Sequence, residues 1–223
     1  MITVLSIIPL SKKGGEKLAV PDVSIDPRLL ESAKRHFLDD GFEKASLRTI
    51  CEDAGITTGA LYKRYSGKDE LFTAVVRETV DAIDTVITQR SSVPVSELSD
   101  TDLIRAWNMD QEDMMWWMRF LNDHHDGFTL LLRCSQGSRW SNFNRDLVER
   151  MSGITWGYLE EAKRRGLSSR QIRREEMYIL LSAFWQTIYE PFIQGFDWDR
   201  IEEHCLLICH LFNWNKVLGF EKD

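Results

Sequence analysis

The residues best suited to chemistry in this chain of 223 residues are hydroxyl and basic side chains between Ser46 and Lys68. Hydroxyl groups and cations are the side chains that contact phosphates and base edges in DNA. Thr58 offers a hydroxyl or a methyl group to a base, and Lys63 offers an ammonium group to guanine O6 or N7. Arg48 is a further candidate for a base or a phosphate. This set of residues therefore predicts a surface that contacts DNA.

Two short helices joined at a glycine are expected to hold these side chains. Ser46 is a suitable N-cap, and an apolar stripe follows it at helical spacing, formed by Leu47, Ile50, Cys51 and Ala54. Gly55 tolerates the left-handed conformation in which many helices end. Thr57 is a second N-cap, and the helix after it is expected to bury Leu61 and Tyr65. This pattern is typical of a helix-turn-helix, and a small packed helical hairpin is the alternative.

The start of the second helix is expected to lie nearest to the DNA. A recognition helix enters the major groove by its N-terminal residues, which here are Thr57, Thr58 and Gly59. Gly59 has no side chain at a point where protein and DNA approach closely. A further helix, the fourth of the chain when the helix that precedes this pair is counted, is expected to begin at Ser66, with Asp69 completing a capping box.

Residues 27–72 resemble the DNA-binding domain of the TetR family of bacterial transcriptional regulators. The residues that carry the resemblance are Gly41-Phe42, Ala54-Gly55, Leu61-Tyr62 and Lys68-Asp69-Glu70-Leu71. The resemblance implies phosphate contacts by Tyr62, Arg64 and Lys68. The complete set of candidate DNA-binding residues is then Ser46, Arg48, Thr57, Thr58, Gly59, Tyr62, Lys63, Arg64 and Lys68.

The resemblance also implies the fold class and the domain organisation. We expect an all-α chain of about nine helices, with an N-terminal extension at residues 1–25. A three-helix helix-turn-helix domain is expected at residues 26–72. A C-terminal helical bundle for effector binding and dimerisation is expected at residues 73–223. The extension carries three lysines, and either a loose tail or a basic arm that reaches the minor groove is compatible with it.

The charge balance favours a homodimer on a palindromic operator. The chain has a net charge of −7, but residues 44–68 hold five basic side chains against two acidic ones, a local charge of +3. One face this weakly positive should bind DNA poorly, and a two-fold dimer doubles the phosphate contacts. The resemblance implies dimerisation through the last two helices. Their apolar stripes, for which an intramolecular core is the alternative, are Met177, Leu181, Phe184, Trp185 and Ile188, and Ile201, Cys205, Ile208, Phe212 and Trp214.

Aromatic residues after residue 100 are candidates for an effector cavity. The resemblance implies a repressor that a small, largely apolar or aromatic effector releases by changing the spacing of the two DNA-binding heads. Core packing is the alternative role for the same residues. The candidate ligand-binding residues are Trp116, Trp117, Phe120, Phe128, Trp140, Trp156, Phe184 and Tyr189.

Two other functions receive less support from the sequence. Cys205 and Cys209 lie four residues apart on one helix face, which would suit a metal- or redox-responsive regulator, but His204 and His210 point elsewhere. The run from His124 to Asp126 could serve an enzyme, but no nucleophile motif or phosphate loop accompanies it. We therefore expect no enzyme activity, no catalytic residues, no cofactor and no metal.

The rest of the chain predicts helices and a cytoplasmic location. Four cysteines suit a reducing compartment, no apolar run is long enough to span a bilayer, and the N-terminus lacks the pattern of a secretory signal. A cap formed by Ser168 and Gln171 is expected to begin the eighth helix, and Pro191 to end or kink it. The helices expected after the third cover about residues 66–90, 102–121, 128–134, 141–165, 168–191 and 197–218.

Overall fold

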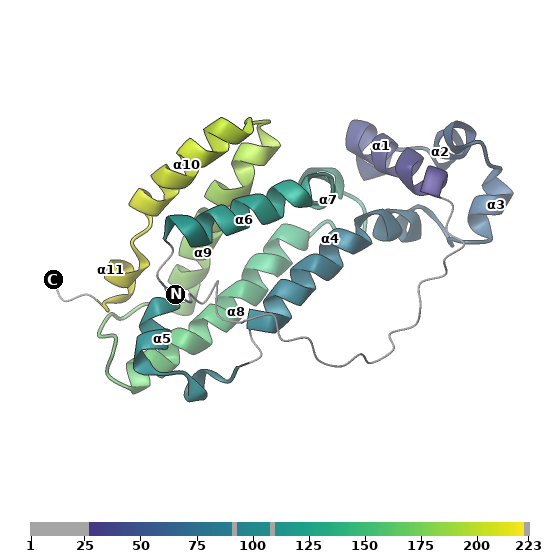
Figure 1. The fold of residues 1–223 in the computed structure, drawn as a ribbon. Helices are drawn as coiled ribbons and strands as arrows, with labels where there is room; N and C mark the ends of the chain where they lie inside the picture. Colours follow the sequence, from purple (N-terminus) through teal and green to yellow (C-terminus); the bar gives the residue numbers. More distant parts are fainter. Residues whose placement is uncertain (1–26, 91–92, 108–109, 221–223) are drawn as a thin grey trace. The chain divides into compact units, whose positions relative to one another are not determined.

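The computed structural model describes residues 27–90, 93–107 and 110–220 (Figure 1), and all regular structure within these ranges is helical. The N-terminal extension lies outside the described residues, so the two interpretations of it, a loose tail and a basic arm, both remain open. No helix in the described ranges is long and apolar enough to cross a membrane. The elements are α1 (Pro27–Lys44), α2 (Leu47–Ala54), α3 (Thr58–Tyr62), α4 (Lys68–Arg90), the 3-10 turn η1 (Val95–Glu97), α5 (Asp100–Arg105), α6 (Gln111–Asp123), α7 (His125–Thr129), the π-helical turn η2 (Leu130–Cys134), α8 (Phe143–Arg164), α9 (Arg174–Ile193), α10 (Trp198–Leu211) and α11 (Trp214–Leu218).

The described chain forms two compact units. The first unit contains residues 27–83 and 124–144, and the second contains residues 84–123 and 145–220. The division therefore falls inside α4. The all-α class and the N-terminal helix-turn-helix agree with the sequence analysis, but the contribution of residues 124–144 to the first unit was not predicted. The exact limits of a DNA-binding domain at residues 26–72 remain a prediction.

A cluster of three phenylalanines forms the centre of the first unit. Phe37 and Phe42 come from α1, and Phe72 comes from the first turns of α4. The ring of Phe72 lies 5.0 Å from that of Phe37 and 5.4 Å from that of Phe42, both in edge-on geometry. Aromatic pairs in this geometry stabilise a core beyond the burial of their area. The cluster therefore holds the end of α1 against the start of α4.

Residues 124–144 pack onto this unit through specific polar contacts. The indole N–H of Trp140 donates to Thr73 Oγ1 at 3.0 Å, and the backbone N–H of Arg139 donates to Asp69 Oδ1 at 2.9 Å. The predicted capping box of Asp69 is therefore wrong. Its carboxylate binds Arg139, and the carboxylate of Glu70 accepts the backbone N–H of Ser66 instead.

Gly127 allows α7 to approach α4 unusually closely within the first unit. A Cβ atom at this position would lie 1.8 Å from Thr79 Oγ1. Thr79 is itself buried, so it has little room to move away. Glycine is therefore required here by packing rather than by a turn.

In the second unit, α6, α9 and α10 pack against one another (Figure 1). Their shared core contains most of the residues proposed for a dimer interface, namely Met177, Leu181, Phe184, Trp185, Ile188, Ile201, Cys205, Ile208 and Trp214, all of which are buried. Phe212 stacks on Trp214, with 5.9 Å between the ring centroids. These apolar stripes therefore form an intramolecular core, which was the alternative interpretation.

Several helix boundaries differ from the predicted ones. The fifth predicted helix is divided into α5 and α6, and the ninth is divided into α10 and α11. The predicted cap at Ser168 is wrong because its hydroxyl donates to the carbonyl of Leu218, and α9 begins at Arg174. The carboxylate of Glu176 accepts the backbone N–H of Arg173 and so caps this helix. Pro191 lies in the last turn of α9, which ends two residues later.

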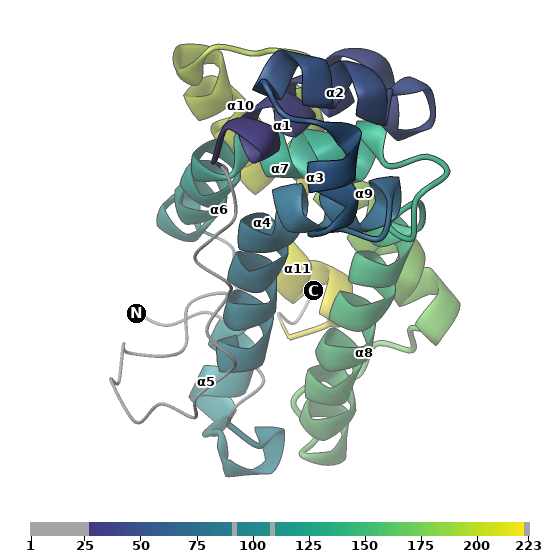
Figure 2. The ribbon, with the colours of Figure 1, turned by 90° about the vertical axis from the view of Figure 1, so that its right-hand side faces the viewer.

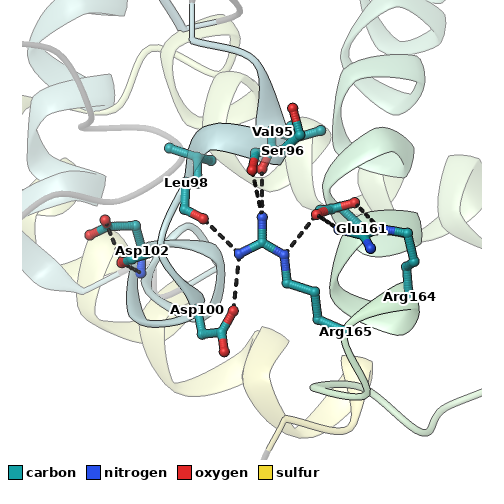
Figure 3. Close-up of polar contacts among 9 residues, drawn as sticks. Val95, Ser96, Leu98, Asp100, Asp102, Glu161, Arg164 and Arg165 are labelled. Atoms are coloured by element: carbon teal, nitrogen blue, oxygen red, sulfur yellow. Dashed lines mark hydrogen bonds and ion pairs between the residues drawn. The ribbon is translucent and has the colours of Figure 1, made fainter.

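Arg165 fixes the segment between α4 and α5 in the second unit (Figure 3). Its guanidinium donates to the carbonyl oxygens of Val95, Ser96 and Leu98 and to the carboxylates of Asp100 and Glu161, at 2.6 to 3.3 Å. The planar guanidinium suits this arrangement because its donors point in fixed directions. Helical periodicity does not reveal this network, because Arg165 and Val95 are 70 residues apart in the chain.

Replacing Arg165 with alanine should lower the melting temperature by several degrees more than replacing Arg164 with alanine. The Arg165 side chain is only 17% exposed, and its removal breaks the hydrogen bonds to the three carbonyl oxygens and to Asp100, while Glu161 keeps its bonds from Arg164. Arg164 is 68% exposed, and its hydrogen bonds go to Glu161. Thermal unfolding followed by circular dichroism measures the difference. Equal melting temperatures for the two variants would show that the network in Figure 3 adds little stability.

The same network predicts a pH dependence of stability. Hydrogen bonds from Arg164 and Arg165 lower the pKa of Glu161 from 4.5 to about 2. A carboxylate with a lowered pKa in the folded state stabilises the chain fully above pH 4.5, and this contribution is lost as the pH falls towards about 2. Glu161→Gln should therefore flatten the loss of unfolding free energy in this window, measured by urea titrations. Glu160→Gln, at an exposed neighbouring position, is the matched control and should leave the profile unchanged.

Candidate nucleic-acid interface

Helix α2 is formed and ended by the local signals in its sequence. Ser46 is the N-cap, and its hydroxyl accepts the backbone N–H of Thr49 at 3.4 Å. Gly55 adopts the left-handed conformation, with φ of 68°, and the N–H of Ile56 bonds back to the carbonyl of Cys51 at 2.9 Å. This turn reverses the chain and directs it into α3, as the helix-turn-helix pattern predicted.

Helix α3 divides its residues between the core and the surface. Thr57 is its N-cap and accepts the backbone N–H of Ala60 at 3.1 Å. Leu61 is completely buried, and Tyr65, just beyond the helix, is 8% exposed. The predicted DNA-binding residues in and next to α3 are exposed, namely Thr57, Thr58, Gly59, Tyr62, Lys63 and Arg64, whereas Lys68 is half-buried. Figure 2 presents the α3 side of this unit to the viewer.

A partly buried polar contact fixes α1 against α2 behind this face. The hydroxyl of Ser32 on α1 lies 2.6 Å from Asp53 Oδ2 and 3.0 Å from the carbonyl oxygen of Ile50. Arg35 forms an ion pair with the same carboxylate. The hydrogen bond from Ser32 lowers the pKa of Asp53, so this carboxylate is ionised at neutral pH. Ser32 and Asp53 are separated by 21 residues, so this contact could not be predicted from local sequence patterns.

Two of the candidate cations have partners within the protein. Arg48 is 84% exposed and forms an ion pair with Glu52, with 2.8 Å between Nε and Oε1. Lys68 donates through Nζ to the carbonyl oxygens of Glu43 and Ala45 at 2.9 and 3.1 Å. Its ammonium also lies 4.8 Å from the ring centroid of Phe42. Lys68 therefore neutralises the C-terminal end of α1, and a phosphate contact by this residue remains a prediction.

The predicted effector residues are distributed over the molecule. An apolar cavity of about 60 Å³ in the second unit is lined by Trp117 and Phe184 from that set. Trp107, Trp185 and Trp214 also line it and were not among the candidate ligand residues. Other members of the set lie elsewhere: Phe128 and Trp140 in the first unit, Trp156 in a separate cleft, and Trp116, Phe120 and Tyr189 outside the lining of the cavity. Trp116 and Trp117 are adjacent on α6 and therefore point in different directions, which leaves Trp117 buried and Trp116 42% exposed.

The cysteine pair of α10 is poorly suited to metal or redox chemistry. Burial raises the pKa of Cys205 to about 12 and also raises the pKa of Cys209. The reactive thiolate is then scarce at neutral pH. Within the described ranges, no group of three or more His, Cys, Asp or Glu residues could hold a metal ion. These observations argue against Cys205 and Cys209 as a sensor.

The fold and the exposed recognition helix define a helix-turn-helix protein. Residues 29–75 match the sequence profile of bacterial regulatory proteins of the tetR family. The chain is 34% identical over 67 residues to the HTH-type transcriptional repressor AcnR of Corynebacterium diphtheriae, a match that covers 30% of this chain and 35% of that protein. It is 24% identical over 208 residues to the repressor KstR2 of Mycolicibacterium smegmatis, covering 75% of this chain and 96% of that protein.

Solved structures extend the similarity to the whole fold. The regulator PfmR of Thermus thermophilus aligns with a TM-score of 0.57 and 18% identity, over 90% of this chain and 100% of that one. A TetR-like regulator from Rhodococcus sp. RHA1 aligns with a TM-score of 0.56 and 22% identity, over the same shares. The tetR-family match is thus confined to residues 29–75, and beyond them the solved structures show a shared fold. These relatives are transcriptional regulators, not enzymes, in agreement with the class predicted from the sequence.

Gly59→Ala should separate DNA binding from stability. A Cβ atom at Gly59 would meet only Thr57 Oγ1, at 3.9 Å, so the folded protein has room for it. Alanine also favours a helix over glycine by about 1 kcal/mol, so the melting temperature should stay or rise. The added methyl group projects from the exposed start of α3, so affinity for the operator should fall about tenfold, measured by fluorescence anisotropy. Unchanged affinity would show that Gly59 does not face the DNA.

Proposed function

We propose that this protein is a DNA-binding transcriptional repressor of the cytoplasm. The observation that supports the proposal most directly is the arrangement of α3, in which Leu61 is buried and the residues from Thr57 to Gly59 are exposed at its start. A helix presented in this way can enter the major groove by its N-terminal end. The similarity to proteins named as transcriptional repressors supports repression rather than activation of the target genes.

The proposed repressor acts as a homodimer through α9 and α10, the two helices predicted for this role, but through other residues than the predicted apolar stripes. On α9 and α10, large apolar side chains remain exposed on the sides opposite to the core, namely Ile179 at 63%, Leu206 at 41%, Leu207 at 65% and Leu211 at 70%. Exposed apolar residues that gather on adjacent helices are typical of an interface. A second copy, related by two-fold symmetry, would cover them and present two recognition helices to a palindromic operator.

The proposed effector is a small uncharged apolar compound bound in the 60 Å³ cavity of the second unit. Four indole rings line the cavity, and none of the described residues that line it is ionisable. A charged group placed there would lose its hydration without a partner. The cavity is smaller than the roughly 150 Å³ that holds benzene in a protein core, so an effector must displace the lining side chains of α6, α8 and α9. That displacement would couple binding to the packing of these helices.

Selection of bound sequences from a random DNA pool tests the central proposal. The expected result is a palindromic consensus, because two identical recognition helices contact two half-sites.

Lys63→Gln should then reduce the slope of log affinity against log salt by about one per protomer, since one phosphate or base contact by a cation is lost. Binding without any sequence preference, or no binding, would contradict the proposal.

Leu207→Glu should convert the proposed dimer into a folded monomer. The substitution places a carboxylate in the apolar surface of α10, where pairing with a second copy would bury it. Light scattering measures the mass, and circular dichroism confirms that the helices remain. Trp116→Gln is the control, because Trp116 is 42% exposed but lies on α6, outside the proposed surface. If light scattering gives the mass of a monomer for the wild-type protein at micromolar concentration, the proposed dimer is wrong.

A further inference from the structure

A cleft between α8 and the start of α9 lies apart from the apolar cavity within the second unit. Its volume is about 240 Å³, and its lining combines polar and apolar groups. Ser152 and Trp156 come from α8, one helical turn apart, and Arg174, Met177 and Tyr178 come from α9. The cleft is thus several times larger than the cavity proposed for the effector, and its chemistry is different.

Two cations meet at the indole ring of Trp156. The ammonium nitrogen of Lys163 lies 5.5 Å from the ring centroid, and the guanidinium carbon of Arg174 lies 5.3 Å from it. Both distances suit cation–π attraction, which stabilises a cation on a ring without neutralising it. Among the described residues, neither cation forms an ion pair with a carboxylate. The site therefore holds two positive charges that repel each other.

The one acidic residue among the described residues that line the cleft, Glu149, forms an ion pair with another residue of α8. Its carboxylate lies 3.8 Å from Nε of Arg145, one turn earlier on the helix. The chain as a whole carries a net charge of −7, so a local excess of positive charge runs against its average. Such an excess attracts anions at short range, where salt screens it least.

Two polar atoms in the lining of the cleft lack a hydrogen-bond partner. These are the hydroxyl oxygen of Ser152 and the indole nitrogen of Trp156, both shielded from solvent. Buried polar groups without a partner are destabilising and are rare in native proteins. Both groups can donate a hydrogen bond, and a serine hydroxyl can turn about a single bond to meet an acceptor. An oxyanion that displaces the side chains covering these donors supplies acceptors for them and charge for the two cations.

We propose that this cleft binds a small oxyanion, a carboxylate or a phosphate, through Arg174 with hydrogen bonds from Ser152 and Trp156, while Lys163 at the Trp156 ring adds positive charge beside the cleft. Met177 and Tyr178 add an apolar wall, so a carboxylate with an aromatic or aliphatic body fits the cleft better than a bare ion. Binding would join the end of α8 to the start of α9. This inference does not depend on DNA binding or on the apolar effector.

Isothermal titration calorimetry of the full-length protein in a low-chloride buffer tests the proposal. Benzoate is the organic probe, benzamide is its uncharged counterpart, and inorganic phosphate tests the ion alone. Benzoate is expected to bind at least about tenfold more tightly than benzamide, because charge-assisted hydrogen bonds are roughly twice as strong as neutral ones. Binding of phosphate as well, or in place of benzoate, would also support the oxyanion site and would identify the anionic group as the feature recognised.

Variants locate the binding in the cleft. Arg174→Gln should weaken benzoate or phosphate binding about tenfold, and Trp156→Phe should weaken it less because the ring remains while its N–H is lost. Arg119→Gln, an exposed position on α6, removes the same charge outside the cleft and should leave binding unchanged. Absence of binding by both anions, equal binding of benzamide, or unaltered binding by Arg174→Gln would overturn the proposal.

Discussion

The five residues of α3 cannot form a stable helix by themselves, and the arrangement of the first unit depends on the burial of Leu61. Isolated helices of this length are unstable in water because the cost of the first turn is not repaid. Burial of a leucine side chain contributes about 1.5 to 3 kcal/mol, and the cap from Thr57 adds about 1 kcal/mol. The short helix therefore owes its shape to tertiary packing. Its polar residues remain exposed because Leu61 alone turns inward.

The packing of α1, α2 and α4 explains how a helix as short as α3 is held in a fixed position with its polar residues exposed. The phenylalanine cluster joins α1 to α4, and the contact between Ser32 and Asp53 joins α1 to α2. Lys68 adds a third connection by donating to the carbonyl oxygens at the end of α1. These contacts hold the elements on either side of α3. A recognition helix held in this way needs little reorganisation when it meets DNA, which lowers the entropic cost of binding.

The second unit separates three kinds of surface on neighbouring helices. One face of α9 and α10 forms the core, another leaves leucine and isoleucine side chains exposed, and the start of α9 contributes to a cationic cleft. The cavity lined by indole rings suits uncharged compounds, whereas the cleft at Trp156 suits anions. A bundle of amphipathic helices can provide such different sites because each helix presents several faces around its axis.

The sequence by itself determined the local structure of the DNA-binding region. Caps at Ser46 and Thr57, the left-handed turn at Gly55 and the inward positions of Leu61 and Tyr65 all follow from interactions within a few residues. Helix boundaries that depend on distant partners were predicted less well. Ser168 and Asp69 both have the residue type of a cap, but each binds a partner far along the chain instead. Only the tertiary structure decided which apolar face of α9 and α10 is buried, because both helices carry apolar residues on more than one side and helical periodicity cannot rank them. It also decided that Arg165 fixes a loop and that Arg174 meets Lys163 at one indole ring, since contacts between residues far apart in the chain arise only when the helices pack.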